Sequence, residues 1–386
     1  MRNTSHRPPL RGWTGSIGLA LVLASCAGST GQVRGDAVAP LRCGRAMQVE
    51  ASTGQCASLR AEVVLEEVSF PSGATPGGQV ELVGVLSRPK FSPEVTAPAK
   101  LPAILLIGGS GPSSRRGAVP GDVAGLYEAP IAVLEDLAMG LTQQGYVVLR
   151  TDKRSCTPAV VPECSYASEV ARRTTWADLV GDVVAASAFL SRQPGVDAHD
   201  IIVMGHSHGG TLALEAAAQL DGVSAVVLLG ALYYPIDAVM VRQINWQVDA
   251  FRESMTRQEI EEAGQQQAAI ESGLLAIREG NMPEDALFMG ASPAFWKAWI
   301  EASSRTEMSV QTARVPILYM RGGEDENASA DDSDGFRAAL KGQAGEVKVL
   351  PGHNHAPGRV GGVSHVSELA LRELVEWLGR APDGAP

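Results

Sequence analysis

The sequence lacks an excess of positive charge. Its 386 residues include 32 Lys and Arg against 43 Asp and Glu, so the formal net charge at pH 7 is −11. A protein that neutralises the phosphates of DNA or RNA needs a basic surface, which is the opposite sign. We therefore expect no nucleic-acid partner.

The sequence also lacks apolar runs long enough to span a membrane. The apolar run Ile17–Ala24 is far shorter than the roughly 20 residues that a helix needs to cross a bilayer. Yet 45% of the residues are hydrophobic and only 19% are charged, which is enough apolar material for a substantial core. The chain is thus neither a multi-span membrane protein nor a disordered one, and its length suits one catalytic core with additions.

The same short apolar run is typical of an export signal, because three arginines and no acidic residue precede it. It ends in Leu23-Ala24-Ser25-Cys26, which resembles the bacterial lipobox, where the cysteine thiol receives lipid. The resemblance implies that residues 1–25 are a lipoprotein signal peptide and that acyl chains on Cys26 hold the protein on a membrane surface. Ala27 after the cysteine implies the outer membrane, facing the periplasm or the cell surface. An ordinary cleaved signal is the alternative.

Cysteine is scarce, with five in the chain. Export permits disulfides, and setting Cys26 aside leaves four cysteines that allow three pairings. We expect the local pairing, Cys43 with Cys56 and Cys156 with Cys164, and free buried thiols are the alternative. None of the four lies beside a histidine or at an evident strand-to-helix turn, so we expect no cysteine nucleophile.

The apolar pattern predicts alternating strands and helices. Two β-rich stretches, 61–70 and 79–86, are separated by turn residues and predict an antiparallel pair. Short apolar runs, typical of parallel strands covered on both faces, follow at 103–107, 146–149, 201–204, 225–229, 317–320 and 347–350. Helical patterns lie between or after them at 129–144, 176–192, 211–220 and 366–378. This order predicts an α/β fold with a doubly wound, mostly parallel sheet.

The alternation breaks once, which sets the expected domain organisation. The stretch 233–314 is rich in Ala, Gln, Glu and Met and has no convincing strand, so we expect a helical lid there. It separates two parts of the core, 61–232 and 315–381, and a tether with an N-terminal extension occupies 26–60. The apolar side chains of the lid either line an acyl pocket or pack as a helical core: Trp246, Phe251, Leu274, Phe288, Phe295, Trp296 and Trp299.

Ser207 is the candidate nucleophile. It is the centre of Gly205-His206-Ser207-His208-Gly209, which directly follows a predicted strand and precedes a predicted helix. A sharp strand-to-helix turn holds a serine hydroxyl in the open, and its glycines let chain segments approach too closely for a Cβ. The alternative is a glycine-rich turn in which Ser207 caps the helix.

In this context the chain resembles the α/β-hydrolases, close to their bacterial esterase-like and serine-aminopeptidase-like members, over about residues 60–380. The segment Ile107-Gly108-Gly109-Ser110-Gly111-Pro112 resembles the superfamily's His-Gly-x-Gly loop, with glycine in place of the histidine. The resemblance implies that the backbone amides of Ser110 and His208 form the oxyanion hole, which needs no special side chain. The segment Leu149–Arg154 resembles the family's Asp-Lys-Arg-Gly segment, except that Ser155 replaces the glycine, and we assign it a structural role.

The same resemblance supplies an acid and a base. Asp325 matches the superfamily's Gly-x-x-Asp turn after a strand, which implies that it orients the catalytic histidine. His355 matches the pattern before the last helix, which implies the general base. The rivals for these two roles are Glu324, Glu326, Asp331, Asp332 and His353. The order Ser207, Asp325, His355 is the order found in α/β-hydrolases.

The sequence therefore predicts a serine hydrolase that cleaves small-molecule carboxylic esters through an acyl-enzyme, with no cofactor. An aminopeptidase or amidase is the alternative, since lid acids such as Glu259, Glu261 or Glu262 can bind a substrate amine. A zinc site on the two His-x-His pairs is disfavoured because side chains around a serine turn diverge, so we expect no metal. A non-catalytic lipoprotein that serves as an interaction scaffold is the alternative of another class.

Overall fold

The computed structural model describes residues 61–73, 76, 78–93, 98–111, 113–119, 131–156, 169–362 and 365–380. The signal peptide, Cys26 and the tether lie outside these residues, so export and lipidation stay predictions. The pairing of the cysteines also stays a prediction, because Cys43, Cys56 and Cys164 lie outside them as well. Among the helices described, none combines the length and the apolar character needed to cross a membrane.

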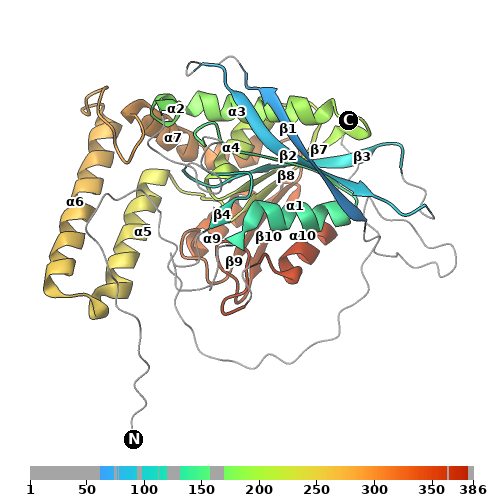
Figure 1. Ribbon diagram of the computed structural model, residues 1–386. Helices are drawn as coiled ribbons and strands as arrows, with labels where there is room; N and C mark the ends of the chain where they lie inside the picture. The colour runs from blue at the N-terminus through green and yellow to red at the C-terminus, as the bar shows by residue number, and fades with distance from the viewer. Residues whose placement is uncertain are drawn as a thin grey trace, which may run out of the picture.

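An eight-stranded sheet forms the centre of the molecule (Figure 1). Its order is β1-β2-β6-β3-β7-β8-β9-β10, in which β2 pairs antiparallel with β1 and β6 and all other neighbours are parallel. The strands are β1 (Glu62–Pro71), β2 (Glu81–Lys90), β3 (Leu101–Ile107), β6 (Val147–Thr151), β7 (Val196–His206), β8 (Val223–Leu229), β9 (Ile317–Gly322) and β10 (Gly345–Leu350). The predicted doubly wound, mostly parallel sheet is confirmed.

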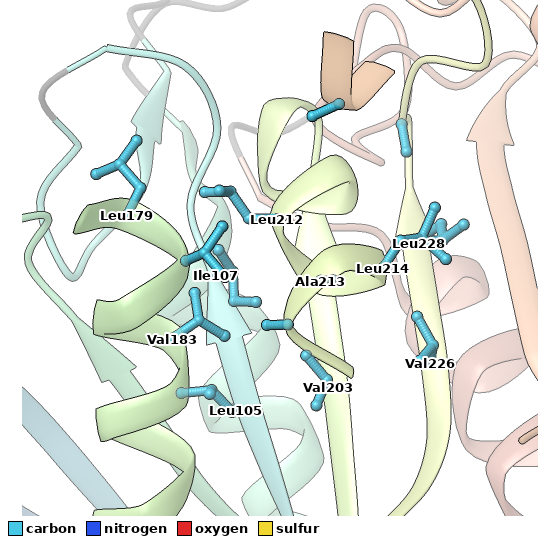
Figure 2. Close-up of a cluster of buried hydrophobic side chains, with 14 of the residues drawn as sticks. Leu105, Ile107, Leu179, Val183, Val203, Leu212, Ala213, Leu214, Val226 and Leu228 are labelled. Atoms are coloured by element: carbon cyan, nitrogen blue, oxygen red, sulfur yellow. The ribbon is translucent and has the colours of Figure 1, made fainter. Parts of the chain in front are cut away.

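Helices cover both faces of this sheet and bury two hydrophobic cores. They are α1 (Val133–Gln143), α3 (Trp176–Ser191), α4 (His208–Ala217), α9 (Ala330–Ala339) and α10 (Glu368–Arg380), and the short α2 (Glu169–Arg173) precedes α3. Successive strand residues point to opposite faces, so Leu105 of β3 joins a core with α3 and α4, whereas Ile104 joins one with α1 and α10. Figure 2 shows the first core, with side chains of α3 and α4 packed onto β3, β7 and β8.

The segment between β8 and β9 is helical, as its sequence predicts. It contains α5 (Ile236–Phe251), η1 (Arg252–Ser254), α6 (Arg257–Glu279), α7 (Pro293–Ser304) and α8 (Thr306–Thr312). In Figure 1, α5 and α6 stand side by side, away from the sheet. A capping box starts α6, because the Thr256 and Glu259 side chains each accept a hydrogen bond from the other's backbone N–H. Whether the segment acts as a lid stays a prediction.

Some element boundaries differ from the predicted ones where long-range pairing decides them. The helix predicted from residue 129 begins at Val133, because β5 (Ile131–Ala132) pairs antiparallel with β4 (Ala118–Val119) in a separate small sheet. Strand β7 is longer than the apolar run 201–204 and starts at Val196, which pairs with Leu101 at the start of β3. Its other end, His206, leads directly into the site.

Candidate active site

Ser207 makes the turn between β7 and α4 by itself. The strand ends at His206 and the helix begins at His208. The backbone of Ser207 has φ 56° and ψ −126°, and such a conformation costs a non-glycine residue roughly 1–3 kcal/mol. Its side chain makes no capping hydrogen bond, and the residue is partly exposed. The hydroxyl therefore does not cap the helix, and the strained turn presents it at the edge of the sheet.

Two glycines allow this turn to pack closely. A Cβ on Gly205 would lie 2.1 Å from the carbonyl oxygen of Gly209. A Cβ on Gly209 would lie 2.4 Å from the carbonyl oxygen of Ile107, the last residue of β3. Backbone atoms cannot move aside cheaply, so neither position accommodates a side chain. The glycines thus bring Ser207 next to the loop that follows β3.

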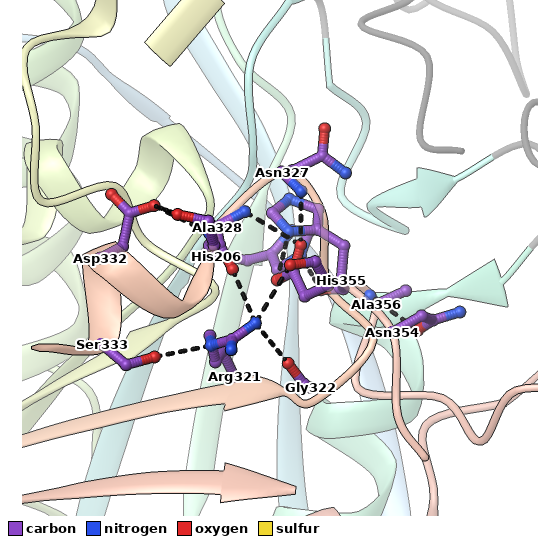
Figure 3. Close-up of polar contacts among 12 residues, drawn as sticks. His206, Arg321, Gly322, Asn327, Ala328, Asp332, Ser333, Asn354, His355 and Ala356 are labelled. Carbon is purple, nitrogen blue, oxygen red and sulfur yellow. Dashed lines mark hydrogen bonds and ion pairs between the residues drawn. The ribbon is translucent and has the colours of Figure 1, made fainter. Parts of the chain in front are cut away.

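His355 and Asp325 form a buried pair. His355 Nδ1 lies 2.9 Å from Asp325 Oδ2, while Asp325 Oδ1 accepts hydrogen bonds from the backbone N–H groups of Asn327 and Ala328 at 2.9 and 3.0 Å. Arg321 donates to the Asp325 carbonyl oxygen at 3.1 Å and so holds the same loop (Figure 3). One carboxylate oxygen is therefore held by the backbone and the other faces the imidazole, which is the arrangement that orients a histidine.

The rival side chains have other partners or are more exposed. Both ring nitrogens of His353 have oxygen partners, at 2.9 and 2.8 Å. Asp332 is part of the capping box that starts α9. Glu324 and Asp331 are exposed, and Glu326 is half-buried. These contacts favour Asp325 and His355, whose catalytic roles stay predictions.

Contacts at the carboxyl ends of the strands bring Ser207 to this pair. The Ser207 N–H donates to the last residue of β8 at 2.8 Å, and the following Gly230 lies against the pair. A Cβ on Gly230 would be 3.0 Å from His355 Nδ1 and 3.1 Å from Asp325 Oδ2. His206 donates from Nε2 to the His355 carbonyl oxygen at 2.9 Å. Ser207 Oγ makes no hydrogen bond to His355 here, and such bonds often tighten only with substrate bound.

Gly230 offers a test of this packing, because it has φ +53° as well as the close contact. Gly230→Ala is expected to lower kcat on the order of 10- to 100-fold by displacing the imidazole. Gly195→Ala is the matched control, since Gly195 has φ +77° with nothing within 4 Å of an added Cβ. Both variants should lose about 1–2 kcal/mol of stability in denaturant unfolding. Equal kcat values in the two variants would contradict the packing argument.

The two predicted oxyanion amides belong to segments next to Ser207. A Cβ on Gly109 would be 3.4 Å from the Cβ of Ser207, so the loop that carries Ser110 passes beside the nucleophile. No described backbone group accepts a hydrogen bond from the Ser110 N–H. His208 is the first residue of α4, and its N–H has no acceptor within the helix. Both amides are thus available to a ligand, although their role stays a prediction.

The end of β6 and the residues just after it hold the loop that follows β3 and contains Ser110. The Lys153 N–H donates to the Ser113 carbonyl oxygen at 2.9 Å. Asp152 accepts from the Arg115 N–H at 2.6 Å, and Arg150 donates to the Arg115 carbonyl oxygen at 2.8 Å. The structural role predicted for this segment therefore consists of fastening the β3–β4 loop. Nothing in the sequence pattern indicated that it reaches the candidate site.

Burial holds His206 and His208, the two residues that flank Ser207 in the chain, in their neutral forms. Burial, helped by the neighbouring His355, lowers the pKa of His206 to about 3. Burial and then Lys153 lower the pKa of His208 well below its ordinary value. Both rings therefore act as neutral hydrogen-bonding groups. Within the described residues no three His, Cys, Asp or Glu side chains are grouped to hold a metal ion.

The aromatic residues of α7 pack mainly as a core. Trp296 and Trp299 are 2% and 3% exposed, and their rings stack with centroids 5.2 Å apart. Leu274 and Phe288 are buried with them. The ring of His208 lies edge-on against Trp299, with centroids 4.3 Å apart. Core packing thus accounts for these four side chains, and α7 reaches the residue after Ser207.

The sheet order, the strained serine turn and the buried Asp–His pair together define an α/β-hydrolase. Residues 127–357 match the serine aminopeptidase S33 family. The match spans more than half of the chain, so the protein belongs to this family. The superfamily predicted from the motifs is therefore confirmed.

Several characterised proteins are similar to this chain. Esterase EstD of Thermotoga maritima is 24% identical over 308 residues, which are 77% of this chain and 65% of the relative. Acylaminoacyl peptidase of Pyrococcus horikoshii superposes with a TM-score of 0.51 at 16% identity, over 83% of this chain and 42% of that chain. A puromycin-hydrolyzing peptidase of Mycobacterium tuberculosis gives 0.50 at 18% identity, over 88% and 44%. The chain spans less than half of these two structures, and the likeness shows the fold alone.

Proposed function

We propose that this protein is a serine hydrolase that cleaves carboxylic esters of small molecules through an acyl-enzyme. The observation that carries the proposal is the strained Ser207 turn packed beside the buried pair of His355 and Asp325. A serine hydroxyl is a poor nucleophile unless a positioned base removes its proton. The contact between the base and the carboxylate that orients it is 2.9 Å long.

In the proposed reaction, His355 accepts the Ser207 hydroxyl proton as Oγ attacks the ester carbonyl carbon. The N–H groups of Ser110 and His208 donate to the resulting oxyanion. Collapse of this intermediate breaks the bond to the alcohol, which leaves with the proton from His355, and Ser207 keeps the acyl group. Water activated by the same imidazole then releases the acid and restores the hydroxyl.

Ester cleavage is favoured over amide cleavage by two observations. The relative from Thermotoga maritima is named an esterase. Two of the three lid acids named for binding a substrate amine have local partners, since Glu259 accepts from the Thr256 N–H at 2.7 Å and Glu262 accepts from Gln258 at 2.9 Å. An aminopeptidase or amidase is the second candidate, supported by the name of the family that the chain matches.

Activity-based labelling followed by a substrate panel tests the proposal. A fluorophosphonate probe should modify the native protein at Ser207, located by peptide mass spectrometry, and heat-denatured protein is the control. We expect kcat/KM on short p-nitrophenyl esters at least about tenfold above that on aminoacyl p-nitroanilides. Labelling with the reverse preference would support the second candidate. If the probe does not label the protein and no substrate is hydrolysed, the result would support a non-catalytic scaffold.

A further inference from the structure

Lys153 places an amine between the Gly109 carbonyl group, which precedes the Ser110 amide, and the ring of His208. Its Nζ donates to the carbonyl oxygen of Gly109 and lies 3.0 Å from His208 Nδ1. The residue as a whole is partly exposed, but its amine end is turned inward against these two acceptors. No step of the proposed reaction uses this side chain.

The contact with Gly109 bears on Ser110 through the peptide bond. The carbonyl group of Gly109 and the N–H of Ser110 belong to one peptide group, which is planar and trans, so they point in opposite directions. A donor that holds the oxygen therefore sets the direction of the N–H. The contact with the His208 ring ties the first residue of α4 to the same amine.

A positive charge on this amine also strengthens the site electrostatically. A hydrogen bond to a carbonyl oxygen polarises the whole peptide group, so the N–H of Ser110 becomes a better donor. A cation near a developing oxyanion stabilises it most where water is excluded. Both effects weaken when the amine loses its proton.

We propose that Lys153 is a positioning residue of the oxyanion hole, which holds the Gly109–Ser110 peptide and His208 in place and acts best in its protonated form. This role rests on the proposed function, because it presumes an oxyanion formed at Ser207. The inference follows from contacts that join three chain segments: the ends of β3 and β6 and the start of α4.

Burial brings the Lys153 amine close to losing its proton, and its titratable neighbours are neutral or paired with other side chains. His208 of α4 and His206 of β7 face it, and burial keeps both neutral by lowering their pKa values. Its chain neighbours Asp152 and Arg154 form ion pairs with other side chains. Burial lowers the pKa of Lys153 to about 7, so protonation of this group changes near neutral pH.

Lys153→Met removes the donor and the charge while keeping a long side chain suited to a buried position. On a p-nitrophenyl ester at pH 6.5 we expect kcat to fall at least about tenfold with KM within about twofold, since the lost interaction acts in the transition state. Lys348→Met is the matched control, because Lys348 of β10 is a half-buried lysine paired with Glu373 and away from the oxyanion loop. It should keep the wild-type kcat.

The pH profile of kcat gives a readout that a merely structural lysine would not move. Lys153 is protonated below its pKa and neutral above it, so wild-type kcat should decline as pH rises through about 7. Lys153→Met should lack that decline, because the group that titrates there is gone. Circular dichroism and thermal unfolding report whether the variant is folded.

Two outcomes overturn the role of Lys153. One is a folded Lys153→Met variant with kcat within twofold of the wild type, and the other is a wild-type kcat that stays level between pH 7 and 9. The second is measured on the unaltered protein and decides the matter if the variant does not fold. If Ser207→Ala is inactive while Lys153→Met is fully active, the positioning role fails and the proposed function stands. If Ser207→Ala is itself active, the proposed function fails.

Discussion

Ser207→Ala is expected to reduce ester hydrolysis on the order of 10⁴-fold or more, because no other group can form the acyl-enzyme. The variant should fold normally. The hydroxyl makes no capping hydrogen bond, and alanine keeps the same Cβ at the strained turn. Steady-state rates on p-nitrophenyl esters, together with thermal unfolding, measure the two effects separately.

The control for this variant is a serine with a purely local contact. Ser191 ends α3, and its hydroxyl donates to the Ala188 carbonyl oxygen at 3.1 Å. Ser191→Ala should therefore keep the full rate. Wild-type turnover by Ser207→Ala would remove the nucleophile from the proposed mechanism, whatever the remaining contacts of the site.

Asp325→Asn is expected to lower kcat by roughly 10³- to 10⁴-fold, because it favours the tautomer of His355 that cannot accept the Ser207 proton. Two backbone N–H groups donate to Oδ1, so the oxygen of an asparagine must take that position. Its NH₂ group then faces His355 Nδ1 in place of the present carboxylate oxygen. The ring must accept there and carry its proton on Nε2, which leaves no acceptor for the Ser207 proton.

Asp332→Asn is the matched control for Asp325→Asn. Asp332 is also buried, accepts from the backbone N–H groups of Tyr233 and Ser329 at 2.9 and 2.8 Å, and pairs with Arg242. Its replacement should lower stability in denaturant unfolding yet leave kcat within about threefold of the wild type. If Asp325→Asn kept kcat within tenfold, Asp325 would not be the orienting carboxylate.

The sheet was predictable because its physical signal is local. A strand covered on both faces must be apolar along its whole length, so runs such as Ile201–Met204 identify the central strands without any knowledge of their neighbours. The turn at Ser207 was predictable for a similar reason. Its glycines, the strand before it and the helix after it lie within one short segment.

The choice between His353 and His355 shows where local signals become weak. Both follow the same strand two residues apart, and only the resemblance to a family favoured the second. In the folded chain, the ring of His353 has oxygen partners on both nitrogens, whereas His355 faces Asp325. The difference depends on which way each side chain points in the folded loop.

The sequence singled out the segment that contains Lys153 but not the contact of Lys153 with the site, since its partners are far along the chain. Gly109 lies 44 positions before it and His208 lies 55 after it. The aromatic residues of α7 show the same limit, because the composition of the helix fits a pocket as well as a core. Only the burial of these side chains against one another and against His208 shows that they form a core and not a pocket.

By itself, the order of the residues determined an α/β-hydrolase sheet and a serine at the turn after β7, because apolar runs and glycines act on their immediate neighbours. The tertiary structure alone decided that His355 meets Asp325, that Gly230 touches both, and that the Lys153 amine reaches the loop beside Ser207. These contacts join chain segments that become adjacent only when parallel strands align their carboxyl ends at one edge of the sheet.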